Sequence, residues 1–227
     1  MESHLKVENL YTGNYSAGQF IAKQSLIIDT DNKSIIVSPG TNFAESRVQK
    51  IVSKYPVKAI IAPNSYHNMG VAIVQEQFDV PCYATNDALL RLSKLPIKSL
   101  TNISQLKVLR EDLTIFIPKA QKMGELWISL GTNAYKTLIV TDAFFNLKNR
   151  GDNFFMSMIS RLVDNAPGFK VSRLFSMLAV TDKKEYSKSV RNYFEVNQVD
   201  EMIVAHGEIQ VGNIKNLVKQ SLSERGL

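Results

Sequence analysis

Short apolar runs alternate with segments of helical periodicity along most of the chain. Two β-branched runs, residues 24–30 and 34–38, are joined by the turn sequence Asp-Asn-Lys at 31–33 and predict a β-hairpin. Apolar residues at 43–55 then recur at helical spacing, and Pro56 ends that pattern. The first quarter of the chain is therefore predicted to contain a hairpin followed by a helix.

The middle of the chain continues this alternation and then changes to strands alone. A strand, a helix, a second strand and a helix capped at Asn86-Asp87 are predicted at 57–62, 69–78, 80–84 and from 86 onward. Four short strands in succession are predicted at 106–109, 113–117, 126–130 and 137–140. Four consecutive strands favour an antiparallel meander over repeated βαβ units.

The last third of the sequence is mainly helical in pattern. Apolar residues between Phe154 and Leu178 predict a helical hairpin, interrupted at Ala166-Pro167-Gly168. Packing in the core is the plainest interpretation of this Phe- and Met-rich stretch, and a dimer face or a lid over a site is the alternative. A capping box, a strand and a last helix are predicted at 182–196, 202–205 and 212–222.

Composition narrows the classes of function. The 227 residues carry a formal charge of +6, and their basic side chains are scattered, so we expect no nucleic-acid partner. No apolar run approaches the roughly 18 residues needed to span a bilayer, and the first residues do not resemble a signal peptide. We therefore expect a cytoplasmic protein without a membrane partner. The single cysteine, Cys82, lies in an apolar run and is interpreted as a buried structural thiol.

Three polar residues directly follow predicted strands, where α/β proteins hold their ligands. They are His67, Asp142 and His206, and the chain contains only three histidines in all. Each has a plain alternative, because His67 could be a hydrogen-bonded loop residue and Asp142 could cap the segment after it. Likewise, Ala205-His206-Gly207 could be a tight turn that needs only its glycine. Motifs for nucleotide binding or a serine nucleophile are absent from the sequence.

The order strand-loop-His67, strand-Thr-Asp142 and strand-Ala-His206-Gly resembles the metallo-β-lactamase-like superfamily over nearly the whole chain. The resemblance implies one domain, residues 1–227, with the α/β fold of a four-layer αββα sandwich. It also implies that the three side chains cluster at one edge of two sheets. Pro63-Asn64-x-x-His67 is similar to a little-studied branch of that superfamily, which carries no firm activity.

Against the superfamily's first metal motif, His-x-His-x-Asp-His, this sequence reads Pro-Asn-Ser-Tyr-His-Asn at 63–68. A further family histidine is expected near 120–124, where Gln121 stands instead. The resemblance implies that all ligands of one metal are lost, whereas counterparts for the other remain at His67, Asp142 and His206. Two imidazoles and one carboxylate could hold one zinc, iron or manganese ion.

Two main functions remain open at this point. One is a mononuclear metal-dependent hydrolase acting on a small molecule, in which Asn64, Asn68 or Glu208 orients water or substrate. The other is a non-catalytic binding or interaction module that keeps the fold. A third interpretation, a membrane-surface or oligomerising protein such as a homodimer, rests on the apolar stretch 154–178. With one ion at most, we expect no β-lactamase activity and no two-metal phosphodiesterase or thioesterase activity comparable to that of the superfamily.

Overall fold

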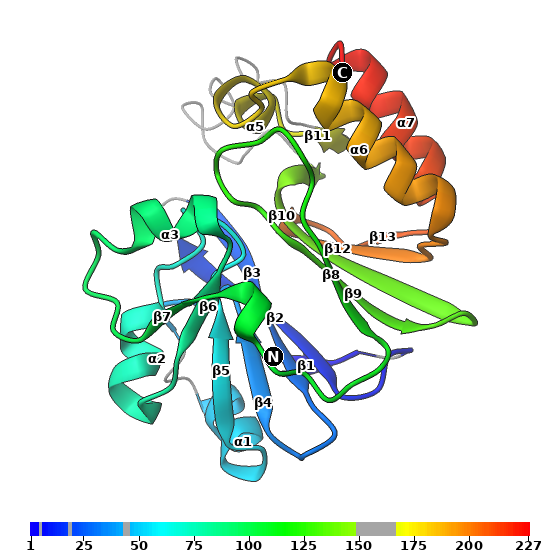
Figure 1. Ribbon diagram of the computed structural model, residues 1–227. Coiled ribbons are helices and arrows are strands. Elements are labelled where there is room, and N and C mark those ends of the chain that lie inside the picture. Colours follow the sequence, from blue (N-terminus) through cyan, green and yellow to red (C-terminus); the bar gives the residue numbers. More distant parts are fainter. Residues whose placement is uncertain (5, 18–19, 43–45, 149–166) are drawn as a thin grey trace. The chain divides into compact units, whose positions relative to one another are not determined.

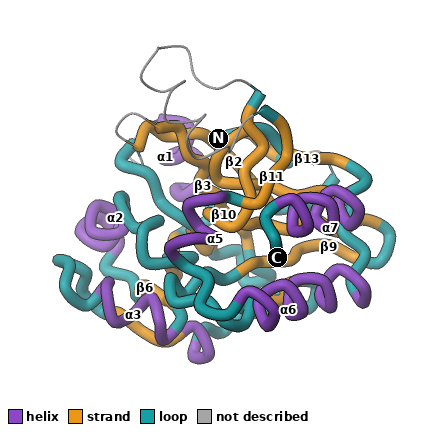
Figure 2. Tube along the Cα trace, turned by 90° about the horizontal axis from the view of Figure 1, so that it is seen from above, coloured by secondary structure: helices purple, strands orange, loops and turns teal. Residues whose placement is uncertain are grey.

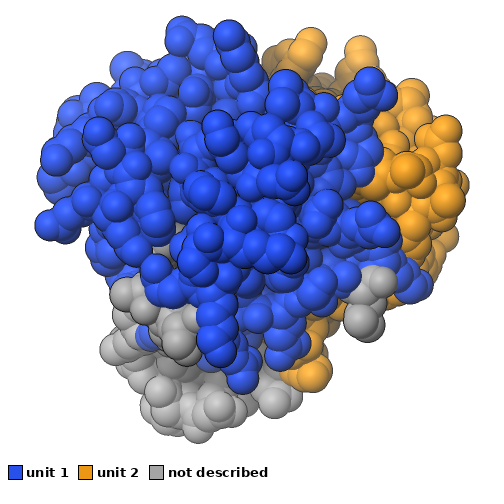
Figure 3. Space-filling view, turned by 90° about the horizontal axis from the view of Figure 1, so that it is seen from below, with its two compact units in different colours: residues 1–113 blue, residues 114–227 orange. Residues whose placement is uncertain are grey.

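The computed structural model describes all residues except 5, 18–19, 43–45 and 149–166. The chain divides into two compact units, Met1–Leu113 and Thr114–Leu227 (Figure 3). Each unit contains a mixed β-sheet with helices packed on it, and each is described by itself below. The prediction of a single domain stays a prediction.

The first unit is built on a seven-stranded sheet in the order β1-β2-β3-β4-β5-β6-β7 (Figure 1). Its strands are β1 (Glu2–Ser3), β2 (Leu10–Ala17), β3 (Phe20–Ile28), β4 (Ser34–Val37), β5 (Val57–Ile61), β6 (Cys82–Ala84) and β7 (Leu100–Asn102). Strands β1 to β4 pair antiparallel, and β4 to β7 pair parallel. The predicted hairpin is confirmed as β3 and β4, with Asn32 in the turn at a φ of 58°.

Three helices cover one face of this sheet. They are α1 (Ser46–Lys54), α2 (Val71–Phe78) and α3 (Asn86–Leu92), and a short 3₁₀ turn, η1 (Ile103–Gln105), follows β7. Helix α3 is capped by Thr85, whose hydroxyl accepts the Ala88 N–H, so the predicted cap at Asn86-Asp87 is wrong by one residue. Cys82 is fully buried beneath these helices, and burial raises the pKa of its thiol to about 12. The structural role predicted for this thiol fits its surroundings.

The segment predicted as a strand at 106–109 is not one. The buried carboxylate of Asp29 accepts the backbone N–H of Leu109, with nitrogen–oxygen distances of 2.8 and 3.1 Å, and its Oδ2 lies 2.6 Å from the Lys58 ammonium. A side chain therefore takes the N–H that a neighbouring strand would otherwise bind.

The second unit is built on a six-stranded sheet in the order β13-β12-β10-β9-β8, with β11 paired to β10. Its strands are β8 (Leu113–Phe116), β9 (Trp127–Thr132), β10 (Tyr135–Leu147), β11 (Gly168–Val171), β12 (Glu201–Gly207) and β13 (Gln210–Val211). Strands β9 and β10 form an antiparallel pair, as predicted, whereas β12 runs parallel to β10. Strand β10 extends well beyond the predicted residues 137–140, and this extension carries the site described below.

Helices α6 (Lys183–Val196) and α7 (Ile214–Glu224) lie side by side on this sheet (Figures 1 and 2). Asp182 caps α6 by accepting the Glu185 N–H at 3.0 Å, which confirms the predicted helix start. Their apolar faces enclose a core around Trp127, whose indole is fully buried. Among the described residues, no helix is long and apolar enough to cross a membrane.

The predicted helical hairpin is only partly covered, because residues 154–166 lie outside the described residues. In the remainder, Gly168–Val171 forms strand β11 instead of helix, because the extended end of β10 offers it a pairing edge. A short helix, α5 (Arg173–Leu178), follows. It buries Phe175 but exposes Leu174 and Leu178, so only part of the expected apolar stripe is covered.

Candidate functional site

Strand β10 contains an irregular bulge of several residues near its centre. Val140 pairs with Val204 of β12, but the next pair along is Phe145 with His206. Residues 141–144 of β10 thus stand opposite Ala205 alone, and their backbone cannot continue the regular ladder with β12. Asp142 lies within this bulge and is partly exposed, whereas Thr141 and Ala143 on either side are buried. The bulge therefore turns the Asp142 side chain away from the core.

A fully buried carboxylate, Glu125, takes up the N–H groups that the bulge withdraws from the ladder. Its oxygens accept the backbone N–H groups of Thr141, Asp142 and Ala143 at 3.3, 3.0 and 3.1 Å. The indole N–H of Trp127 also donates to Glu125, at 3.2 Å. A buried backbone N–H without an acceptor destabilises the folded state, so Glu125 stabilises the bulge by accepting these three N–H groups.

Glu125 and Asp142 are electrostatically linked. Burial, together with the negative charge of Asp142, raises the pKa of Glu125 to about 8, although the N–H groups that it accepts act in the opposite direction. Two neighbouring carboxylates repel each other when both are ionised.

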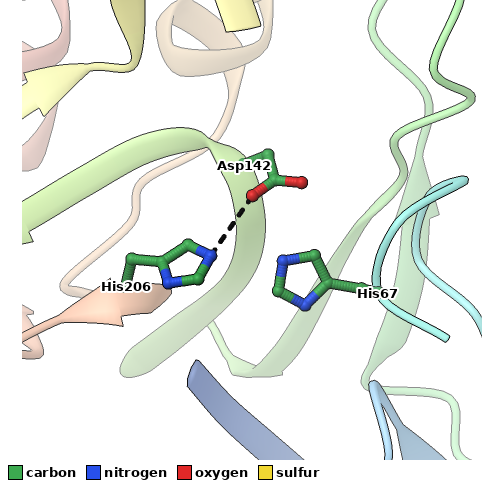
Figure 4. Close-up of side chains that lie close together, drawn as sticks. All are labelled: His67, Asp142 and His206. Atoms are coloured by element: carbon green, nitrogen blue, oxygen red, sulfur yellow. Dashed lines mark ion pairs between the residues drawn. The ribbon is translucent and has the colours of Figure 1, made fainter. Parts of the chain in front are cut away.

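His206 lies at the end of β12, beside the bulge, where its ring contacts the ring of Phe145 at a centroid distance of 4.7 Å. Its Nε2 is 3.4 Å from Oδ1 of Asp142, and both side chains are partly buried (Figure 4). This separation is long for a hydrogen bond, which is usually about 2.7–3.2 Å. It matches the roughly 3.4 Å expected between two ligands that bind one tetrahedral ion at about 2.1 Å.

His67 belongs to the first unit, in the loop between β5 and α2, and it is buried. Its Nδ1 lies 2.8 Å from the hydroxyl of Ser38, which in turn lies 3.2 Å from the hydroxyl of Tyr15. Ser38 follows β4 and has a φ of 53°, in the left-handed region that non-glycine residues seldom adopt. A partner on Nδ1 fixes the orientation of the ring and makes Nε2 the nitrogen suited to a metal ion.

The residues predicted to orient water or substrate have distinct surroundings. Asn64 is fully buried, and its Oδ1 accepts the backbone N–H groups of Tyr66 and His67 at 2.8 and 2.9 Å, so it shapes the histidine loop. The amide nitrogen of Asn68 donates to the Ser65 carbonyl at 2.8 Å. The side chain of Glu208 is more than half exposed and lies 3.3 Å from the Lys148 ammonium. Their role toward water or substrate stays a prediction.

Gln121 stands where the superfamily resemblance would place another histidine, and its role is structural. Its amide oxygen accepts the Glu125 N–H at 3.1 Å, and its amide nitrogen donates to the Glu125 carbonyl at 3.2 Å. Gln121 therefore fixes the backbone of the residue that supports the bulge. The predicted loss of one metal of the pair stays a prediction.

Of the predicted ligands, the structure brings Asp142 and His206 together within the second unit and describes His67 within the first. Sequence reasoning missed Glu125 and Tyr15. A signal for Glu125 was present, because an acid that directly precedes the apolar run Leu-Trp-Ile-Ser-Leu would be buried if the strand began earlier.

Comparison with known proteins identifies the fold. No protein-family profile and no curated protein matches the sequence. The crystal structure of DIM-1 metallo-β-lactamase is similar, with a TM-score of 0.68 and 15% identity over 98% of this chain and 96% of that chain. VMB-1 has a TM-score of 0.64 and 13% identity over 97% and 94%. A B3 metallo-β-lactamase with an active-site glutamic acid has a TM-score of 0.59 and 13% identity over 100% of this chain and 91% of that chain.

These similarities confirm the predicted fold class, an α/β fold with two mixed sheets that matches metallo-β-lactamase structures. Identities of 13 to 15% establish the fold alone. The narrower resemblance to a branch marked by Pro63-Asn64-x-x-His67 stays a prediction.

Proposed function

We propose that this protein is a mononuclear metal-dependent hydrolase acting on a small molecule, with His67, Asp142 and His206 as the metal ligands. The observation that carries the proposal is the 3.4 Å separation between Asp142 Oδ1 and His206 Nε2 at the bulge of β10. That distance suits two ligands of one ion better than a direct hydrogen bond. The metallo-β-lactamase fold supports the proposal as an analogy, because fold alone does not determine function.

The donor chemistry suits a divalent transition metal. The three side chains offer two imidazole nitrogens and one carboxylate oxygen, a set that could hold an ion. Imidazole with carboxylate suits zinc, iron or manganese, and three protein ligands leave a position for water, as in catalytic zinc sites. Such an ion supplies Lewis acidity, which can lower the pKa of a coordinated water to about 7.

The other residues of the site would orient and support the ligands. Ser38 holds Nδ1 of His67, so that His67 would bind through Nε2. Contact with Phe145 limits the rotation of the His206 ring. Glu208 follows His206 by two residues, and its mostly exposed carboxylate could accept a proton from water or bind a cationic part of a substrate.

A binding module without catalytic activity is the second candidate, and Gln121 favours it. A residue at a position expected to bind metal is committed to backbone hydrogen bonds, and Pro63 and Ser65 replace two further histidines. A protein that lost one ion could retain the other to bind a ligand or to stabilise the fold.

Metal analysis of protein purified without chelator, followed by Co²⁺ titration of the metal-free protein, tests the proposal. We expect one ion per chain, lost in His67→Ala, Asp142→Asn and His206→Ala. His4→Ala is the matched control, because the remaining histidine accepts the N–H groups of Lys6 and Val7 near the N-terminus. The loaded protein would then be assayed against a panel of esters, thioesters and phosphodiesters, with lactams added as compounds that we expect it not to hydrolyse.

Each result of these measurements has a defined meaning. Turnover of a panel member that disappears with the metal and with the three ligand variants would support the hydrolase. One bound ion without turnover would support the binding module instead. Two tightly bound ions per chain, or ion binding that the three ligand variants leave unchanged, would contradict the proposed site.

A further inference from the structure

The bulge of β10 has an unusual support. Three consecutive backbone N–H groups, of Thr141, Asp142 and Ala143, point at one buried carboxylate instead of at a neighbouring strand. Backbone N–H groups of successive residues in a strand normally point to opposite sides. The chain must therefore curl around Glu125 at this place, and Asp142 lies at the middle of the curl.

We propose that Glu125 is a positioning residue of the metal site, which holds the bulge of β10 so that Asp142 presents its carboxylate to an ion beside His206. The proposal rests on the proposed metal site. Glu125 is fully buried and acts through the backbone of Asp142. It is therefore separate from the ligands themselves.

The placement of Asp142 follows from these contacts. Oε2 of Glu125 accepts the Asp142 N–H at 3.0 Å, while Oε1 accepts those of Thr141 and Ala143 on either side. Three anchored amides leave the backbone of Asp142 little freedom to rotate. Its side chain is partly exposed although its neighbours are buried, and Oδ1 lies 3.4 Å from Nε2 of His206. Positioning of this kind places a ligand oxygen before any ion arrives.

Glu125 is itself held on both sides. Gln121 forms two hydrogen bonds with the Glu125 backbone, and the indole N–H of fully buried Trp127 donates to its Oε1. Because Glu125 is held rigidly, it can fix the position of Asp142 relative to the core, which a mobile side chain could not do.

The variant Glu125→Gln tests the proposal because it keeps the size of the side chain but replaces one acceptor oxygen with an NH₂ group. At least one N–H of the bulge then faces a donor, and Asp142 loses its fixed place. We expect Co²⁺ affinity to fall about 10- to 100-fold, as for other residues that orient ligands. The visible absorption of bound Co²⁺ should also change, since it reports the geometry of the ligands around the ion.

Glu201→Gln is the matched control. Glu201 is another buried carboxylate of the same sheet, at the first residue of β12, where it accepts the hydroxyl of Tyr135 at 2.7 Å. We expect Co²⁺ affinity and spectrum to remain those of the wild type in this variant, even where both variants unfold at a lower temperature. A general loss of stability would affect the two variants alike, so their difference isolates the positioning role.

A second variant keeps the test decisive if Glu125→Gln does not fold. Gln121→Ala removes the two hydrogen bonds that hold the Glu125 backbone but keeps the Glu125 carboxylate. We expect this variant to lose less Co²⁺ affinity than Glu125→Gln. Wild-type affinity and spectrum in a folded Glu125→Gln or, failing that, in Gln121→Ala would overturn the positioning role alone. Wild-type protein that binds Co²⁺ without turnover would overturn the hydrolase and leave the positioning role standing. Wild-type protein that binds no Co²⁺ would overturn both.

Discussion

Gly207 is the position where a single methyl group should test the geometry of the site most directly. It has a φ of 110°, and a Cβ built on it would lie 2.0 Å from the carbonyl oxygen of Asn146 and 2.3 Å from its carbonyl carbon. To reach a tolerable 3.0 Å, strands β10 and β12 must separate locally by about 1 Å, the difference between 3.0 and 2.0 Å. The same oxygen accepts the Glu208 N–H at 2.7 Å, so that hydrogen bond would be strained as well.

The cost of Gly207→Ala has two parts. A side chain at this φ costs about 1–3 kcal/mol. Forcing a methyl group into a packed position costs about 1–3 kcal/mol more. We therefore expect the free energy of unfolding to fall by about 2–6 kcal/mol in urea denaturation. Because His206 immediately precedes Gly207, we also expect weaker binding of Co²⁺.

Gly212→Ala separates the two parts of this cost. Gly212 also has a positive φ, 68°, but no described atom lies within 4 Å of its hypothetical Cβ. Its substitution should cost only the backbone strain, about 1–2 kcal/mol. If Gly207→Ala proves no more destabilising than Gly212→Ala, and binds Co²⁺ as the wild type does, the close approach of β12 to Asn146 is refuted, and with it the fixed position of His206.

Three further substitutions test the packing of the second unit and an ion pair of the first. Phe175→Asp should lower the free energy of unfolding by at least about 3–5 kcal/mol, because the ring is buried and a charge would replace it. Met177→Asp is the control: this side chain is 68% exposed, so its substitution should change the free energy of unfolding by about 0.5 kcal/mol or less. Equal effects of the two substitutions in urea denaturation would place Phe175 outside the core. Burial raises the pKa of Asp29, but the Lys58 ammonium and the Leu109 N–H outweigh the effect of burial and hold the pKa below 3.8. Ionised Asp29 therefore stabilises the fold above about pH 3.8, and this stabilisation is lost as the pH falls through the folded-state pKa of Asp29. Asp29→Asn should therefore flatten the acid limb of a urea-midpoint profile, and an unchanged limb would show that the ion pair does not form.

Most regular elements could be predicted from the sequence, since their patterns are local. The hairpin of β3 and β4 has two β-branched runs and a turn, and the cap of α6 follows from Asp182 and Glu185. Apart from the cap of α3, which was misplaced by one residue, the errors concern pairings between distant residues. Strand β11 depends on the free edge that the long β10 provides, and the irregular segment at 106–109 depends on Asp29, eighty residues away from Leu109. Neither partner is visible in a local window.

The candidate ligands could be predicted because they follow apolar strands, a position where many α/β proteins bind ligands. The prediction that Asp142 and His206 lie together is confirmed within the second unit. The alternative in which only the glycine of Ala205-His206-Gly207 matters is partly right, since Gly207 has a strict conformational role. The participation of His67 in the same site stays a prediction.

Glu125 could not be assigned a role from the sequence, and the reason is physical. A bulge depends on register between two strands, and the apolar run before Asp142 reads as an uninterrupted strand. The local sign was a carboxylate that directly precedes an apolar run, and such a charge is costly to bury unless several hydrogen-bond donors contact it. Three of the donors described for Glu125 are backbone N–H groups, which every sequence contains. A buried acidic residue near a strand that carries a candidate metal ligand is therefore a reason to look for a bulge. The buried carboxylate needs hydrogen-bond donors, and the backbone N–H groups of a bulge can supply them.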